Sequence, residues 1–162
     1  MKKGRDDHNQ ISASGARSSS PILVCDNARQ AAMIGRMKHT EGFLRIVNDA
    51  KTRVKEVTVE ETQARLSANP QARLIDVRED NEWEAGHAKG AEHLGKGIIE
   101  RDIETQVPDK STELILYCGG GYRSALAAGV LQQMGYTNVW SMAGGWKAWK
   151  ESNAPVAIKN SA

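Results

Sequence analysis

Cysteine is scarce in this sequence, and long apolar runs are missing. Two cysteines, Cys25 and Cys118, cannot form the disulfide framework of a small secreted protein, and free thiols suit a reducing compartment. No apolar run approaches the ~20 residues of a membrane-spanning helix, and the first residues lack the apolar stretch of a signal peptide. These absences predict a soluble, cytoplasmic protein that does not bind membranes.

The sequence also has no large excess of charge of one sign and no spacing typical of metal ligands. The formal net charge is +2, from 22 basic and 20 acidic side chains, so the sequence offers no basic surface that would favour nucleic acid. The four histidines share no metal-ligand spacing with each other or with the two cysteines. We therefore expect neither a nucleic-acid partner nor a metal site.

Composition divides the chain into four parts. Residues 1–21 are polar, charged and rich in serine and glycine, which predicts a disordered tail. Residues 22–55 carry helical patterns and are interpreted as a helical extension. Residues 56–157 are predicted to form one globular domain, and residues 158–162 a short tail.

Two helices are expected in the extension. Asp26 can cap a helix that runs through Lys38, and Thr40 can cap a second helix that runs to about Lys55. The second helix has one apolar face. The extension could therefore pack on the domain or mediate a homodimer, and packing is the simpler interpretation.

Strand and helix patterns alternate through the globular domain. This alternation predicts an α/β fold with a parallel sheet and helices on both faces, whose ligands bind at the carboxyl ends of the strands. A capping box, Thr58 with Glu61, opens the first helix. The expected strands are Arg73–Val77, Ala91–Leu94, Glu113–Tyr117 and Asn138–Ser141, and the expected helices are Glu60–Ser67, Asp80–Ala85, Ile98–Val107, Ser124–Met134 and Trp146–Ser152.

The loop after the third expected strand carries the candidate chemistry. Glycines permit positive φ, so consecutive N–H groups can turn inward and, beside a helix N-terminus, favour a thiolate on Cys118. Arg123 could strengthen this field or lock the loop by pairing with Glu79, Asp80 or Glu82. The residues that follow Cys118 are Gly119, Gly120, Gly121, Tyr122, Arg123 and Ser124.

This loop resembles the active-site loop of single-domain rhodaneses, which are sulfurtransferases. Leu74–Glu79, with the Gly86–Ala91 segment that follows, resembles the N-terminal signature of that family, and Gly144–Trp149 resembles its C-terminal signature. Order and spacing match from about residue 57 to residue 157. The resemblance implies a rhodanese-like, five-stranded parallel sheet with helices on both faces.

The resemblance also implies a reaction. Cys118 would take a sulfane sulfur from a small donor such as thiosulfate, hold it as a persulfide, and pass it to a thiol, to cyanide or to a sulfur-accepting protein. The backbone of Gly119–Ser124 would cradle the persulfide, and neither a metal nor an organic cofactor would be needed. Apart from Arg123 the loop has no cation, so the thiosulfate dianion is not favoured as the donor.

Two other functions stay open at this point. Cysteine-dependent phosphatases and arsenate reductases combine a cysteine, a curled loop and an arginine, but the phosphatase loop has one residue more than the four between Cys118 and Arg123. The shorter loop favours a sulfur-sized ligand. A non-catalytic rhodanese-like binding module is the other alternative, although such modules usually lack the cysteine.

Several neighbouring side chains have both a functional and a structural interpretation. Asp76 and Arg78 could shape the rim of the site, or could form an ion pair that supports the following loop. His87 is expected to make a structural hydrogen bond. Tyr122 could form a pocket wall or shield the loop, and the turn at residues 142–145 could touch the loop.

Overall fold

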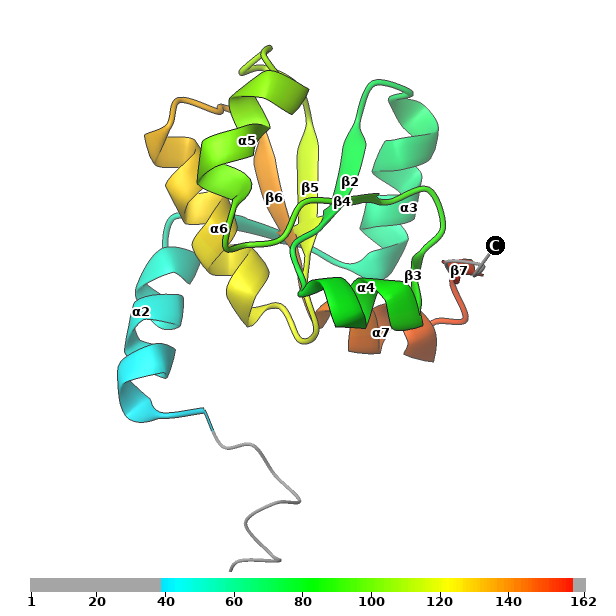
Figure 1. Ribbon diagram of the computed structural model, residues 1–162, viewed down its shortest axis with the longest axis horizontal. Helices are drawn as coiled ribbons and strands as arrows, with labels where there is room; N and C mark the ends of the chain where they lie inside the picture. The colour runs from blue at the N-terminus through cyan, green and yellow to red at the C-terminus, as the bar shows by residue number, and fades with distance from the viewer. Residues whose placement is uncertain (1–38, 159–162) are drawn as a thin grey trace, which may run out of the picture. The chain divides into compact units, whose positions relative to one another are not determined.

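A computed structural model describes residues 39–158 of the protein (Figure 1). The expected tail at residues 1–21, the first expected helix and Cys25 lie outside the described residues. No helix within the described range is long and apolar enough to cross a membrane.

Five strands form one sheet in the order β1-β6-β5-β2-β4, and every pairing is parallel. The prediction of a five-stranded parallel sheet is therefore confirmed. A separate antiparallel pair, β3 with β7, was not predicted. The strands are β1 (Lys55–Val57), β2 (Arg73–Asp76), β3 (His87–Ala88), β4 (Glu92–His93), β5 (Leu114–Tyr117), β6 (Val139–Met142) and β7 (Val156–Ala157).

Helices cover both faces of the sheet, as expected (Figure 1). α5 and α6 supply buried side chains to the core on one face, and α3 and α7 supply them on the other. The predicted capping box is present at the start of α3, where Thr58 and Glu61 bond reciprocally. The helices are α2 (Glu41–Lys51), α3 (Val59–Ala68), α4 (Asp80–Ala85), α5 (Ile99–Gln106), α6 (Tyr122–Gln133) and α7 (Gly145–Glu151).

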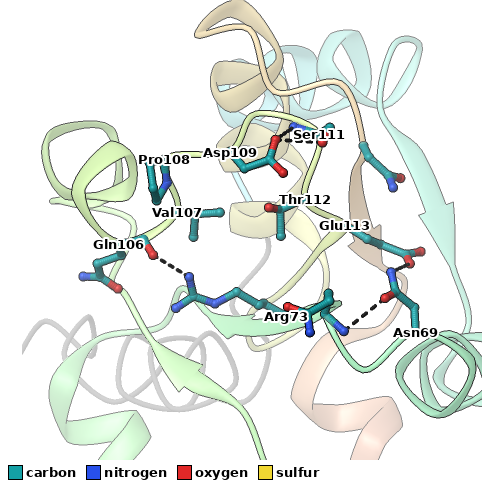
Figure 2. A pocket seen from close by; sticks show the side chains of 11 residues that line it. Asn69, Arg73, Gln106, Val107, Pro108, Asp109, Ser111, Thr112 and Glu113 are labelled. Atoms are coloured by element: carbon teal, nitrogen blue, oxygen red, sulfur yellow. Dashed lines mark hydrogen bonds between the residues drawn. The ribbon is translucent and has the colours of Figure 1, made fainter.

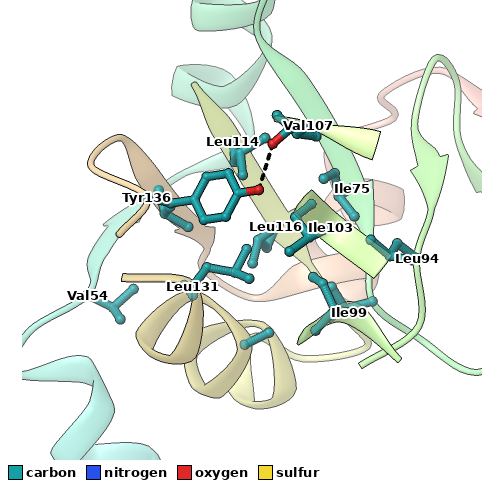
Figure 3. Close-up of a cluster of buried hydrophobic side chains, with 14 of the residues drawn as sticks. Val54, Ile75, Leu94, Ile99, Ile103, Val107, Leu114, Leu116, Leu131 and Tyr136 are labelled. Carbon is teal, nitrogen blue, oxygen red and sulfur yellow. Dashed lines mark hydrogen bonds between the residues drawn. The ribbon is translucent and has the colours of Figure 1, made fainter. Parts of the chain in front are cut away.

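Strand β5 is buried on both faces. Leu114 and Leu116 join the core beneath α5 and α6, whereas Ile115 and Tyr117 join the core on the opposite face. A strand covered on both sides reads as a continuous apolar run in the sequence. Figure 3 shows the core beneath α5 and α6. There the Tyr136 hydroxyl donates to the Val107 carbonyl at 2.6 Å, so this buried hydroxyl has a hydrogen-bond partner.

Helix α2 is shorter than the sequence predicted. The Thr40 side chain accepts a hydrogen bond from the Phe43 N–H, which confirms the expected cap. The helix ends at Lys51 and not near Lys55, because residues 55–57 pair with strand β6 as β1. The fifth strand of the sheet therefore spans the predicted boundary: Lys55 was assigned to the extension, whereas residues 56–57 were assigned to the domain without a strand.

Helix α2 lies alongside α6 (Figure 1). Val47 and Ala50 on α2 are buried, and Gly129 on α6 lies close to Ala50. A Cβ at Gly129 would lie 3.7 Å from Val54 and 3.8 Å from Ala50, which are ordinary contact distances. Packing of the described part of the extension on the domain is thus observed, and a homodimer stays a prediction.

Candidate active site

Cys118 follows β5 at the carboxyl end of the sheet. Its side chain is 1% exposed and lies on the face covered by α6. The sulfur accepts hydrogen bonds from the Gly121 N–H at 3.2 Å and from the Ser124 hydroxyl at 3.6 Å. An inert cysteine in an apolar core would have no such donors, whereas a thiolate requires them. The surroundings therefore suit a reactive sulfur.

The loop itself is shorter than expected. Gly121 has φ +89° and caps α6, so the helix begins at Tyr122 and not at Ser124. Gly119–Gly121 form the loop proper, and Tyr122 through Ser124 lie in the first turn of the helix. The left-handed conformation at Gly121 fixes this start, because a residue with a side chain adopts it only at a cost.

The Gly144–Gly145 turn and the first turn of α7 hold the loop in place and together form the α7 clamp. The Trp146 N–H donates to the Cys118 carbonyl at 2.6 Å, and the Lys147 N–H donates to the Gly119 carbonyl at 3.1 Å. Gly145 has φ +52°, and a Cβ there would lie 2.2 Å from the Cys118 carbonyl oxygen. The expected contact between this turn and the loop is confirmed. By binding two loop carbonyls, the first turn of α7 fixes the loop that presents the Gly121 N–H to the sulfur.

Arg123 is paired with a carboxylate. Its guanidinium binds both oxygens of Glu82, at 2.7 and 3.0 Å, with Glu79 at 3.8 Å. The hydrogen bond from Arg123 lowers the pKa of Glu82 below its ordinary value. A Cβ on Gly119 would lie 3.2 Å from the guanidinium, so this group lies against the loop. Asp80, the third expected partner of Arg123, does not pair with it and lies 3.7 Å from His93.

Asp76 and Arg78 form a buried ion pair. Both Asp76 carboxylate oxygens accept hydrogen bonds from the Arg78 guanidinium, at 2.6 to 3.0 Å, and both side chains are almost fully buried. Arg78 also donates to the Gly86 carbonyl at 2.7 Å, and its guanidinium lies 4.8 Å from the Trp146 ring centroid. None of the hydrogen bonds found within residues 39–158 joins the pair to Cys118. The pair therefore supports the rim and helix α7, and does not contact the sulfur.

Tyr122 connects the loop to helix α2. Its ring lies beside Gly120, at 3.5 Å from the position that a Cβ would take there. The ring centroid is 4.4 Å from that of His39 and 6.2 Å from that of Phe43. This half-buried ring covers the loop, which favours the shielding interpretation. The sequence alone offered no signal that the extension would reach the active loop.

Ser141 on β6 was missed as a candidate. Its hydroxyl is 2.9 Å from that of Ser124, and both serines are fully buried. The available signal was a lone serine in the apolar strand Val139–Met142. The prediction for His87 is confirmed, because its Nδ1 lies 3.0 Å from the main-chain carbonyl of Trp83.

A cavity of about 400 Å³ lies at the opposite, amino-terminal edge of the sheet (Figure 2). Two of its charged side chains are already paired: Arg73 binds Glu92 and the Gln106 carbonyl, and Glu113 accepts from Arg65 and Asn69. Glu113 and Cys118 flank β5, so roughly 16 Å of extended chain separates the cavity from the sulfur. The cavity is therefore not part of the cysteine site.

Comparison with known proteins identifies the family. The rhodanese-like domain matches residues 58–152, which are more than half of the 162-residue chain. The chain therefore belongs to the rhodanese-like domain family. The matched region includes the loop after Cys118, the Asp76–Arg78 ion pair and the α7 clamp, while α2 and β1 precede it.

Two similar proteins are named sulfurtransferases, and a third is described as a possible phosphatase. The thiosulfate sulfurtransferase PspE of Escherichia coli is 38% identical over 73 residues, which are 45% of this chain and 69% of PspE. The structure of the polysulfide-sulfur transferase homodimer of Wolinella succinogenes has a TM-score of 0.65 and 26% identity, covering 74% of this chain and 90% of that one. A protein of Rhodopseudomonas palustris, described as a possible tyrosine phosphatase, has a TM-score of 0.64 and 27% identity, covering 75% and 98%.

Proposed function

We propose that the protein is a sulfurtransferase that carries a sulfane sulfur as a persulfide on Cys118. The observation that carries this proposal is the set of donors around the sulfur, the Gly121 N–H and the Ser124 hydroxyl, at the start of α6. Such donors stabilise a negative sulfur at the carboxyl end of a parallel sheet, where ligands of these folds bind. The sulfurtransferase names among the relatives support the same chemistry.

The reaction proceeds as two displacements. The Cys118 thiolate attacks the outer sulfur of the donor, a sulfur–sulfur bond forms, and the remainder of the donor leaves with the electron pair of the broken bond. An acceptor thiolate or cyanide then attacks that outer sulfur, and the electron pair of the persulfide bond returns to Cys118. Neither step uses a metal or an organic cofactor. A reducing cytoplasm keeps Cys118 as a thiol between cycles.

Charge around the loop bears on the choice of donor. Arg123, the cation of the loop, is held by Glu82, so little unpaired positive charge faces an incoming dianion. We therefore expect a persulfide or polysulfide, which carries less charge per sulfur, to load Cys118 more readily than thiosulfate does. Thiosulfate should still react, with a high KM.

The same pairing argues against phosphatase or arsenate chemistry. A phosphate-binding loop uses the positive charge of its arginine to hold the phosphate dianion, and here Glu82 already accepts from both terminal nitrogens of Arg123 and neutralises that charge. A phosphate bound here would therefore meet an ion pair and not a free cation. Turnover of an aryl phosphate by the wild-type protein, lost in Cys118→Ser, would favour the phosphatase function instead.

The proposal is tested by mass spectrometry after exposure to thiosulfate, a mercaptopyruvate-type donor and polysulfide. Wild-type protein is expected to gain one sulfur on the Cys118 peptide and to lose it on addition of cyanide, with formation of thiocyanate. Cys118→Ser should neither load nor turn over, and Cys25→Ser, the matched cysteine variant, should do both. If no donor loads Cys118, the sulfurtransferase assignment is wrong. A stable protein partner found under that outcome would support a binding module.

A further inference from the structure

Two buried hydroxyls and the active sulfur form a short chain. The Ser141 hydroxyl lies 2.9 Å from the Ser124 hydroxyl, which in turn lies 3.6 Å from the Cys118 sulfur. All three side chains are at most 1% exposed, so bulk water does not compete for these hydrogen bonds. Among hydrogen bonds within residues 39–158, Ser124 is the side-chain partner found for Ser141.

The directions of these hydrogen bonds follow from counting hydrogens. A serine hydroxyl has one hydrogen and accepts through its lone pairs. If Ser124 gives its hydrogen to the sulfur, the contact between the serines requires Ser141 to donate to Ser124. If Ser124 instead gives its hydrogen to Ser141, the sulfur loses a donor. The direction of the bond between the two serines therefore determines whether Ser124 points its hydrogen at Cys118.

The charge on the sulfur favours one of these two arrangements. A hydrogen bond to an ionised acceptor is about twice as strong as one between neutral groups, and aligned hydroxyls in a low-dielectric interior reinforce each other. The arrangement Ser141 to Ser124 to sulfur thus gains most when Cys118 is a thiolate. With a neutral thiol, the two directions differ less.

We propose that Ser141 is a positioning residue, which directs the Ser124 hydroxyl at the Cys118 sulfur and so favours the thiolate. The proposal rests on the proposed function only in taking Cys118 as the reacting group. No proton moves along the chain of hydroxyls. The thiol proton leaves to solvent, and the serine hydrogens only rotate.

Charged groups near the sulfur define the electrostatic background for this effect. Arg123 in the first turn of α6 faces the loop, and Glu82 on α4 and Glu79 just before α4 pair with it. Ser141 contacts none of these three groups in the described part of the chain. Its replacement therefore changes the hydroxyl chain and leaves the charges in place.

The experiment is the pH dependence of alkylation by iodoacetamide in the full-length protein. Trypsin releases Cys118 and Cys25 on different peptides, residues 111–123 and 18–29, so each thiol is followed separately. In Ser141→Ala we expect alkylation of Cys118 at neutral pH to fall by about threefold to tenfold, with its pH midpoint moved upward. The Cys25 peptide should react as in wild type.

Two further variants separate positioning from a structural role. Thr62→Val removes another fully buried hydroxyl, one that bonds the Thr58 carbonyl, and should leave Cys118 alkylation unchanged. Ser124→Ala should slow alkylation at least as much as Ser141→Ala. The double variant of the two serines should match Ser124→Ala, because Ser141 acts through Ser124. Circular dichroism and thermal melts establish that each variant is folded.

Either of two results would overturn the proposal. One is a folded Ser141→Ala protein whose Cys118 alkylation profile is unchanged. The other is a double variant in which the two effects multiply, since independent effects exclude action through Ser124. Failure of every donor to load wild-type Cys118 would instead refute the sulfurtransferase function, and the alkylation result would still decide the role of Ser141.

Discussion

Replacing Gly145 by alanine tests whether the α7 clamp shapes the active loop. A Cβ at this position would lie 2.2 Å from the Cys118 carbonyl oxygen. Ordinary contacts of about 3.5 Å require the two segments to separate by more than 1 Å. Because a hydrogen bond is lost beyond about 3.5 Å, such a shift breaks the bonds from Trp146 and Lys147 to the loop carbonyls.

The loss of unfolding free energy in Gly145→Ala can be compared with that of a control variant. Gly135→Ala also places alanine at a positive φ, +96°, but a Cβ there would meet nothing within 4 Å. That variant should lose about 1–2 kcal/mol of unfolding free energy from backbone conformation alone. Gly145→Ala should lose about 1–2 kcal/mol for its own left-handed φ of +52°, plus about 1 kcal/mol for each of two broken hydrogen bonds, or about 3–4 kcal/mol in total.

Urea unfolding measures the stabilities, and sulfur loading of Cys118 reports the shape of the loop. Gly135→Ala should load sulfur as wild type does, under conditions where both proteins are folded. Gly145→Ala should load at least tenfold more slowly even where it is folded, because the loop that presents the Gly121 N–H to the sulfur is no longer held. Equal losses of stability and equal loading in the two variants would refute the reasoning.

Three other substitutions test the surroundings of the site. Arg78→Met leaves Asp76 buried without its cation and should cost about 3–5 kcal/mol in urea unfolding, whereas a cost below 1 kcal/mol would contradict a tightly bonded pair. Because Arg123 lowers the pKa of Glu82, their pair contributes stability above the ordinary glutamate value of 4.5 and loses it as pH falls further. The melting temperatures of wild type and Arg123→Gln should therefore differ at neutral pH and converge in acid; a gap that persists in acid would exclude this ion pair as its cause. Phe43→Ala removes a half-buried ring that lies 6.2 Å from the Tyr122 ring and should lower the free energy of unfolding in urea by about 1–3 kcal/mol. An unchanged free energy of unfolding would contradict a stabilising contact between α2 and Tyr122.

Much of the fold was predictable because its signals are local. The apolar run at Leu114–Tyr117 identified the central strand, and the Thr58–Glu61 box identified the start of α3. Strand β1 was not predicted because it has only three residues, of which two are exposed, and because it forms by pairing with the distant strand β6. Short strands of this kind carry no alternating pattern to detect.

The site shows the same division between local and distant signals. Cys118 and its glycines were recognisable, because a nucleophile in a glycine-rich turn before a helix is a local pattern. The start of α6 was misplaced because Ser124 is a favourable residue for a helix start, yet its hydroxyl contacts the sulfur and Ser141. No spacing rule connects Ser141 to Cys118, since they meet only when β5 and β6 pair.

The α7 clamp makes the active loop depend on chain that follows it by 27 residues, from Cys118 to Gly145. During synthesis, the ribosome adds Cys118, the strand before it and the helix after it before the residues that hold the loop in shape. A fragment that stops before Gly144 would retain every side chain of the loop and still lack the N–H groups that bind its carbonyls. The proposed reactivity of Cys118 would therefore depend on docking of α7, and we expect a chain cut between α6 and α7 to lose that reactivity although Cys118 itself is intact.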